Sequence, residues 1–251
     1  MVLPLYLALT AAEISYVSPL PNLCAYMACH FSPYTEGLSN VPDALPFGSV
    51  LILNDRIPCD HHSADLVAGQ LAAAVERLGC ESVLLDFQRP PDAESCAMVR
   101  VILQALPCPV AVTESFAQDF SCAVFLSPAP LHVPLACHLA PWKGREIWLE
   151  AALCQERITI TKSGTSFEPI FPTQQLEGGF YDAKLHCNYH TVVSGDRITF
   201  TLFDTCESLK TKLELARSLG VTRAVGLYQE LGTFLTGKES SRPSIADRIL
   251  L

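Results

Sequence analysis

The stretch from Ser49 to Phe87, SVLILNDRIPCDHHSADLVAGQLAAAVERLGCESVLLDF, decides the fold. It holds two short apolar runs, 49–54 and 82–87, on either side of a longer segment. Within that segment, apolar residues recur from Ser63 to Leu78 at the spacing of an amphipathic helix, and Gly79 follows as a helix stop. A strand, a helix and a second strand in this order form a βαβ unit. The stretch therefore predicts a parallel sheet with crossover helices.

The same alternation of apolar runs and helical stretches continues through the rest of the chain. Eight runs have the length and composition of buried parallel strands. They are Leu3–Leu9, Leu23–Phe31, Ser49–Asn54, Ser82–Phe87, Val110–Thr113, Ala123–Leu126, Glu146–Ala151 and Arg223–Tyr228. Eight parallel strands close a (β/α)8 TIM barrel, a fold of roughly 250 residues, and this chain has 251. We therefore expect a single domain over residues 1–251.

Two further helices are marked by their terminal residues. The segment Asp92–Leu106 begins with acidic residues, which favour a helix N-terminus. The segment Cys206–Leu219 follows Asp204, and Glu207 three residues later completes the pattern of a capping box. Gly220 then marks the end of this helix.

Residues 157–203 depart from the barrel pattern. Two β-rich segments, 157–161 and 197–203, flank Ser-Gly turn sequences, which predicts a hairpin-bearing insertion between strands seven and eight. The tail, 236–251, mixes Gly, Ser, Pro and charged residues. We expect it to pack loosely or as a short terminal helix.

The composition argues against several classes of function. The net charge of -9 and the pI near 5.2 leave no clustered basic residues for a nucleic acid. The eleven cysteines show neither a C-x-x-C pair nor the spacing of a zinc site, so we expect free thiols in a cytoplasmic protein, with no metal and no other cofactor. The opening MVLPLYLALTAA is apolar, but it lacks a basic start and is too short to span a bilayer. We expect a strand there and no membrane partner.

Polar residues gather where the expected strands end. In TIM barrels the loops that follow the strands build the ligand site. Carboxylates, amides and aromatic rings at this rim suit a polyhydroxylated ligand such as a carbohydrate. The candidates for catalysis are Asp86, Glu150 and Glu114. The candidates for ligand binding are Gln88, Arg89, Asn54, Asp55, Tyr228, Glu230 and His30.

One segment at this rim resembles a known signature. Residues 79–88 read GCESVLLDFQ, which is similar to a degenerate form of D-G-x-D-x-D-x-E, the fourth-strand signature of family-18 glycoside hydrolases. That family includes chitinases and spore-lytic glucosaminidases. Aligned without a gap, the fixed positions of the signature hold Glu81, Ser82, Leu84, Asp86 and Gln88. In this resemblance Gln88 takes the place of the glutamate that protonates the leaving oxygen.

A second segment resembles the same family. Residues 203–210, FDTCESLK, and 224–232, AVGLYQELG, are similar to a closing pattern of an aspartate, a serine, a lysine one turn on and an eighth strand that ends in tryptophan. Tyr228 stands at the position of the tryptophan, which implies an aromatic floor for a sugar ring. Residues 179–182, GFYD, are also similar to the insertion that precedes the last helix of the family. The resemblance implies a TIM barrel and an amino-sugar ligand.

The departures from the signature concern its chemistry. An amide at Gln88 delivers no proton, whereas general-acid assistance supplies about 10²–10⁴-fold in rate. Leu84 replaces the middle aspartate, which in the family helps to orient the N-acetyl group of the substrate. A polar rim without its acid predicts a protein that binds an amino-sugar polymer or oligosaccharide and is weak or inactive as a family-18 hydrolase.

Two alternatives stay open at this point. The first is an active glycosidase that uses other carboxylates of the rim, with Asp86, Glu114 and Glu150 as candidates. A carboxyl separation of roughly 5–5.5 Å suits a retaining reaction, and one of roughly 6.5–9.5 Å suits an inverting reaction. The second alternative is a non-enzymatic interaction scaffold, in which the polar residues at the strand ends only form hydrogen bonds and contact solvent.

Overall fold

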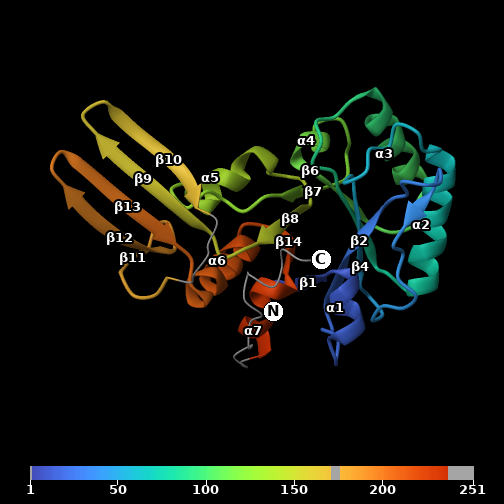
Figure 1. Ribbon diagram of the computed structural model, residues 1–251, viewed down its shortest axis with the longest axis horizontal. Helices are drawn as coiled ribbons and strands as arrows, with labels where there is room; N and C mark the ends of the chain where they lie inside the picture. Colours follow the sequence, from blue (N-terminus) through green and yellow to red (C-terminus); the bar gives the residue numbers. More distant parts are fainter. Residues whose placement is uncertain (1, 171–175, 237–251) are drawn as a thin grey trace.

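The computed structural model describes residues 2–170 and 176–236, and its centre is a closed barrel of parallel strands (Figure 1). The barrel strands are β1 (Leu5–Leu9), β2 (Cys24–Phe31), β4 (Val50–Asn54), β5 (Ser82–Asp86), β6 (Val110–Thr113), β7 (Ala123–Leu126), β8 (Ile147–Ala151) and β14 (Val221–Leu227). They pair in the order β1-β14-β8-β7-β6-β5-β4-β2, and a β1–β2 pairing closes the ring. The predicted (β/α)8 barrel is confirmed. Seven of the expected segments each contain one barrel strand, and the eighth, 223–228, overlaps β14, which begins two residues earlier.

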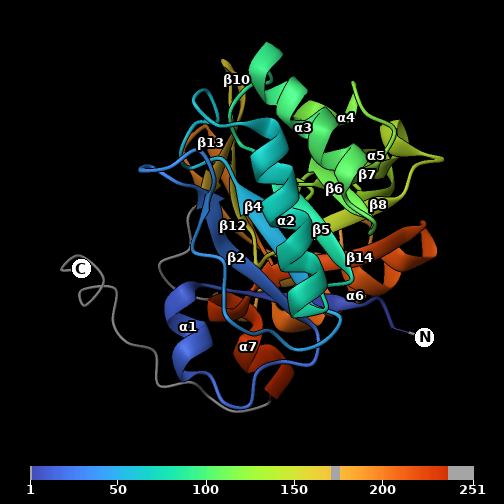
Figure 2. The same cartoon turned by 90° about the vertical axis from the view of Figure 1, so that its right-hand side faces the viewer.

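Two long helices cover one side of the barrel. They are α2 (Ala64–Leu78) and α3 (Ala93–Ala105), which lie side by side on the outside of the strands (Figure 2). Ser63 caps α2 through its hydroxyl, and Gly79 ends it with a left-handed φ of 65°. Asp92 caps α3 and accepts a hydrogen bond from the backbone N–H of Ser95. Both helices begin and end close to where their terminal residues predict.

The third predicted helix, α6 (Cys206–Ser218), begins at the predicted residue and ends one residue earlier than expected. Its N-cap is Thr205, and the capping box is completed by Ser208 rather than by Glu207. Asp204 is unable to cap the helix because its buried carboxylate binds the ammonium of Lys212, at 2.8 and 3.0 Å. The expected Asp204 cap is therefore wrong, since a buried ion pair takes the side chain that the pattern assigned to the helix end.

The remaining helices are short. They are α1 (Ala11–Tyr16), α4 (Glu114–Ala117), α5 (Leu135–Leu139), the 3₁₀ turn η1 (Ala140–Trp142) and α7 (Tyr228–Thr236). A small strand, β3 (Leu38–Ser39), pairs with β2 in antiparallel fashion in place of a crossover helix. The last barrel strand ends at Leu227, so Tyr228 opens α7 instead of closing the strand as predicted. In the part of the chain that the structure describes, no helix has the length and apolar character to cross a membrane.

The insertion between β8 and α6 is larger than a hairpin. Its strands are β9 (Gln155–Thr161), β10 (Gly164–Ile170), β11 (Phe180–Asp182), β12 (Cys187–Ser194) and β13 (Arg197–Phe203). They form a five-stranded antiparallel sheet in the order β10-β9-β13-β12-β11, which projects from the barrel in Figure 1. Two hairpins, β9–β10 and β12–β13, are joined because β13 pairs with the free edge of β9. Of the expected tail, 236–251, Thr236 ends α7, and residues 237–251 lie outside the described residues.

The core has an inner part within the barrel and an outer part between strands and helices. The inner cluster holds Tyr6, Ala8, Ala25, Val50, Ile52, Leu84, Ala111, Ala123, Phe125, Trp148 and Val225. At the N-terminal ends of the strands, Arg223 lies over the ring of Trp148 at 4.9 Å and pairs with the carboxylate of Glu81. This end of the barrel is therefore plugged by packed side chains, which leaves the opposite end for a site.

Candidate functional site

The geometry of the strands brings several polar side chains to the C-terminal end of the barrel. Ile52, Leu84 and Trp148 belong to the inner cluster. Side chains two residues apart on a strand point to the same face. The residues two positions later, Asn54, Asp86 and Glu150, therefore point into the barrel mouth, and Asn54 lies opposite Asp86 in the β4–β5 pairing.

Asp86 is the central acid of this mouth. It is the last residue of β5, and its carboxylate accepts a hydrogen bond from the side-chain amide of Gln88. Burial raises the pKa of Asp86, the amide of Gln88 lowers it, and the negative charge of Asp55 raises it further. The net effect is a pKa above the ordinary value of 3.8. Asp86 therefore holds its proton more tightly than a solvent-exposed aspartate does.

Two more carboxylates surround Asp86. Burial raises the pKa of Glu150, and the charges of Asp86 and Glu230 raise it further. Glu230 lies in α7, and its carboxylate accepts a hydrogen bond from the backbone N–H of Leu153. Glu150 on β8 thus lies close enough to Asp86 on β5 and to Glu230 on α7 for both charges to act on it. Carboxyl groups that raise one another's pKa hold their protons more tightly than exposed ones do, which is a property that general acids need.

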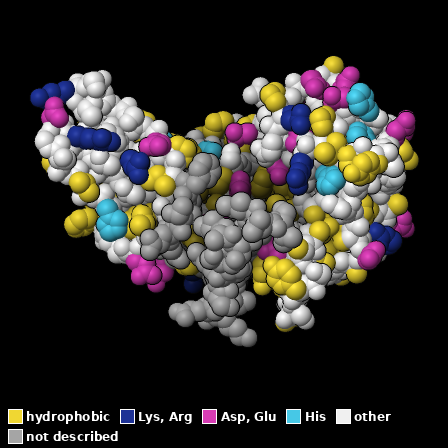
Figure 3. All heavy atoms as spheres, viewed as in Figure 1, with side chains coloured by type: hydrophobic (Ala, Val, Ile, Leu, Met, Phe, Trp, Pro, Cys, Tyr) yellow, Lys and Arg dark blue, Asp and Glu magenta, His cyan; other side chains and the backbone are white. Residues whose placement is uncertain are grey.

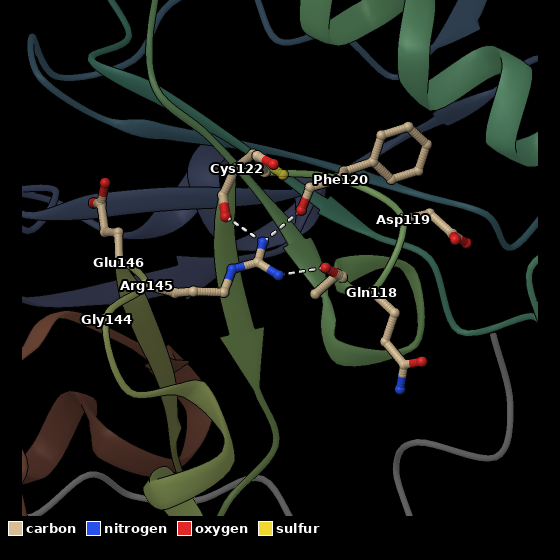
Figure 4. A pocket seen from close by; sticks show the side chains of 9 residues that line it. Gln118, Asp119, Phe120, Cys122, Gly144, Arg145 and Glu146 are labelled. Carbon is tan, nitrogen blue, oxygen red and sulfur yellow. Dashed lines mark hydrogen bonds between the residues drawn. The ribbon is translucent and has the colours of Figure 1, made fainter.

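Figure 3 views the molecule from the direction of Figure 1. The surface is hollowed between the insertion sheet and the side of the barrel that carries α2 and α3, and acidic side chains lie in the hollow. A second cavity, of about 420 Å³, lies at the opposite rim before β7 and β8. There the guanidinium of Arg145 donates to the carbonyls of Ala117, Phe120 and Cys122 (Figure 4). Its fork is occupied by main chain, so it serves structure at that rim.

Asp55 and Arg89, both predicted to bind a ligand, are engaged with each other and with the main chain of the loop after β5. The side chain of Asp55 is buried, at 7% exposure, and its two oxygens accept the backbone N–H groups of Gln88 and Arg89, each at 2.9 Å. Arg89 also donates through Nε to the backbone carbonyl of Asp55 at 3.2 Å. Both oxygens of Asp55 are thus taken by the loop after β5, which leaves them poorly placed for a ligand.

Asn54 and His30 are also engaged by local partners. The amide of Asn54 donates to the backbone carbonyls of Met27 and Cys29, each at 3.0 Å, where β2 has an irregular register. One ring nitrogen of His30 bonds to the carbonyl of Phe31 at 2.6 Å, and the other lies 3.1 Å from the amide of Asn40. These contacts hold both side chains in place at the rim, and their contact with a ligand stays a prediction.

Glu114 and Tyr228 have other surroundings than Asp86, Glu150 and Glu230 have. Glu114 is an exposed residue in the first turn of α4, beyond the end of β6. Tyr228 is half-buried and packs against the outer core. A Cβ placed on Gly232 would lie 2.9 Å from its ring, so the ring rests on that glycine. The aromatic floor at Tyr228 stays a prediction.

The sequence interpretation missed one polar group beside the mouth. Lys212 binds Asp204, and Ser208 donates to the same carboxylate at 2.9 Å. The resemblance pointed to a lysine within residues 203–210, but the lysine that reaches Asp204 lies two turns into α6. A spacing of eight residues from a loop into a helix carries no local signal. Only the folded chain brings these groups together.

A metal site is not formed by the described residues. Within 2–170 and 176–236, no group of three or more His, Cys, Asp or Glu side chains has the arrangement to hold a metal ion. All eleven cysteines lie within these ranges and are free thiols.

Comparison with known proteins finds similar structures but no similar sequences. No family model matches this sequence, and no curated protein matches it. A family-18 N-acetylglucosaminidase from Paenibacillus barengoltzii has a similar structure, with a TM-score of 0.57 and 8% identity over 89% of this chain and 94% of that one. This chain has the fold of a family-18 glycoside hydrolase structure.

Two further solved structures support this likeness. The spore cortex-lytic enzyme SleL of Bacillus cereus has a TM-score of 0.55 and 11% identity over 96% of this chain and 76% of its own. The chitinase ChiW from a Paenibacillus species has a TM-score of 0.59 and 9% identity over 94% of this chain and 42% of its own. At these identities the likeness concerns the fold alone, so function has to be argued from the site.

Proposed function

We propose that this protein binds an amino-sugar polymer or oligosaccharide at the barrel mouth and is weak or inactive as a family-18 hydrolase. The observation that carries the proposal is the contact between Gln88 and Asp86. The amide of Gln88 stands at the position of the signature's acid and donates its hydrogen bond to the Asp86 carboxylate. An amide has no proton to give to a leaving oxygen, and loss of a general acid removes about 10²–10⁴-fold in rate.

The polar groups of the mouth support a carbohydrate as the ligand class. Asp86, Glu150 and Gln88 offer several acceptors and donors at the C-terminal end of the barrel, which suits a ligand with many hydroxyl groups. Two structures with a similar fold are those of a chitinase and an N-acetylglucosaminidase. Those two enzymes motivate N-acetylglucosamine oligosaccharides as the first ligands to test.

A second candidate function is favoured by a specific observation. The pKa values of Asp86 and Glu150 are both raised by burial, and the charge of Asp86 raises that of Glu150. A pair of carboxyls close enough to interact is what glycoside hydrolysis needs. In this alternative one of the pair protonates the leaving oxygen, and the other acts as base or nucleophile.

The test uses chitin and peptidoglycan oligosaccharides with the intact protein. Binding is measured by calorimetry and product formation by mass spectrometry for the wild type, Gln88→Glu, Asp86→Asn and Glu150→Gln. Asp119→Asn, an exposed residue at the opposite rim, is the matched control. We expect wild-type binding without product, and a gain of product in Gln88→Glu of about 10²-fold or more over background.

Each other outcome has a defined meaning. Product from the wild type that disappears in Asp86→Asn or Glu150→Gln, but not in Asp119→Asn, would support the second candidate. Absence of both binding and product would contradict both and leave the interaction scaffold. Affinity that is lost in Asp119→Asn would show that the ligand binds away from the mouth.

A further inference from the structure

The loop after β5 is anchored by a carboxylate that follows the neighbouring strand. Asp55 comes directly after β4, one residue past Asn54, so its side chain lies on the other side of the strand from the barrel axis. There its Oδ1 accepts the backbone N–H of Gln88 and its Oδ2 accepts that of Arg89. A carboxylate with a backbone donor on each oxygen is a strong and geometrically specific anchor.

This anchor determines where the amide of Gln88 can lie. The side chain of Gln88 leaves from a fixed main chain and reaches back two residues to the Asp86 carboxylate. We infer that Asp55 is a positioning residue, which fixes the main chain at Gln88 and so holds the amide against Asp86. The inference rests on the proposed function only in treating Asp86 and Gln88 as part of the ligand site.

Asp55 and Gln88 change the pKa of Asp86 in opposite directions. The direction in which that pKa moves in a variant therefore tests the inference. The hydrogen bond from Gln88 lowers the pKa of Asp86 more than the charge of Asp55 raises it. Glu150, on the facing strand, also interacts with Asp86. If Asp55 holds Gln88 in place, Asp55→Asn loses both effects, and the pKa of Asp86 rises. If Asp55 acts only through its charge, the pKa of Asp86 falls.

The first measurement is a carbon-13 NMR titration of the Asp86 carboxyl in the intact protein. We compare the wild type with Asp55→Asn and Gln88→Ala, with Asp119→Asn as the control for a lost surface charge. The expected result is a raised pKa of Asp86 in both Asp55→Asn and Gln88→Ala, and no change in Asp119→Asn. A lowered or unchanged pKa in Asp55→Asn would overturn the inference.

The second measurement follows hydrogen exchange of the backbone amides of residues 88 and 89. In Asp55→Asn the new amide group places a donor against one of these N–H groups, so exchange should accelerate roughly tenfold or more. In Gln88→Ala exchange should match the wild type, because Asp55 binds the main chain and not the side chain. Faster exchange in Gln88→Ala would contradict the inference. This comparison stays informative even if Asp55→Asn does not fold.

A third measurement separates the inference from the proposed function. Affinity for N-acetylglucosamine tetrasaccharide is measured for both single variants and for the double variant. If Asp55 acts through Gln88, the double variant binds as weakly as Gln88→Ala does, without further loss. Failure of the wild type to bind the tetrasaccharide contradicts the proposed function, whereas the titration and exchange results still decide the role of Asp55.

Discussion

Glu150 shows how a single residue of the barrel mouth acquires its chemistry. It lies two positions after Trp148 in β8, so the same alternation that buries the indole turns the carboxylate toward Asp86 and Glu230. Burial and both neighbouring charges raise the pKa of Glu150 above its ordinary value of 4.5. The ionised form is therefore disfavoured in the folded protein, and the neutral form is favoured.

We predict that Glu150→Gln increases the free energy of unfolding at neutral pH. A carboxyl whose pKa is raised on folding gives its stabilisation below the unfolded value, and that stabilisation is lost as the pH rises through the folded pKa. Glutamine imitates the neutral form at every pH. The variant should therefore be more stable than the wild type at pH 7.5, and the difference should vanish as the pH falls below 4.5.

Urea unfolding at both pH values measures this difference. Glu36→Gln, at an exposed position of the loop after β2, is the matched control and should show no pH-dependent gain. A Glu150→Gln protein that is less stable than the wild type at pH 7.5 would count against like-charge repulsion in the mouth.

Part of the site was predictable from the sequence. Asp86 and Glu150 come together because the strands of a closed barrel end at one rim, and strand ends are visible as apolar runs. Glu230 follows the last strand in the first turn of α7. The engagement of Asp55 and His30 was not predictable. Asp55 accepts backbone N–H groups of the loop after β5, and His30 contacts the carbonyl of Phe31 and the side chain of Asn40. No residue pattern encodes such contacts.

At the scale of one element, the start of α6 shows how two neighbouring residues take different roles. Thr205 supplies the capping hydroxyl, and Asp204 forms the buried pair with Lys212. We predict that Thr205→Ala lowers the free energy of unfolding by about 1 kcal/mol. Asp204→Ala should cost more, about 3–5 kcal/mol, because it leaves Lys212 largely buried without its partner.

Chemical denaturation of both variants measures these losses. Thr211→Ala, within the same helix, is the matched control and should be nearly neutral, since alanine is the best helix former. Equal losses for Thr205→Ala and Asp204→Ala would contradict the separate roles of the two side chains.

The elements themselves divide into those that the sequence predicts well and those that it does not. The barrel strands and α2 were predictable, since apolar runs and helix caps are local signals. The full extent of the insertion sheet was not. Strand β10 reads GTSFEPI and is almost entirely exposed, with glycine and proline in place of a clear apolar alternation. Such an edge strand is stabilised by its pairing with β9, which is a property of the folded sheet.

At the scale of the whole molecule, the two ends of the barrel have different tasks. The mouth gathers acids that repel one another, whereas the opposite end is closed by Arg223 among Tyr6, Trp148 and Glu81. Between the two ends lies the packed inner cluster. TIM barrels commonly separate a stabilising rim from a ligand rim in this way.

This separation predicts that Arg223→Met destabilises the protein without changing its ligand site. Arg223 is largely buried over the Trp148 ring, and a desolvated cation over an indole contributes about 2 kcal/mol. Glu81, at 40% side-chain exposure, can be hydrated when its partner is lost, so the free energy of unfolding should fall by about 2 kcal/mol. Arg100→Met, which removes an exposed cation over Phe120, should cost at most about 1 kcal/mol.

The ligand site provides the decisive comparison. Five residues of a strand separate the rims by roughly 16 Å, about twice the Debye length at physiological ionic strength, so a lost charge at one rim should have little effect at the other. The carboxyl titration of Asp86 and the affinity for N-acetylglucosamine tetrasaccharide should both be unchanged in Arg223→Met. A shift in either quantity, in a variant that is still folded, would mean that the plug and the mouth are coupled through the inner cluster.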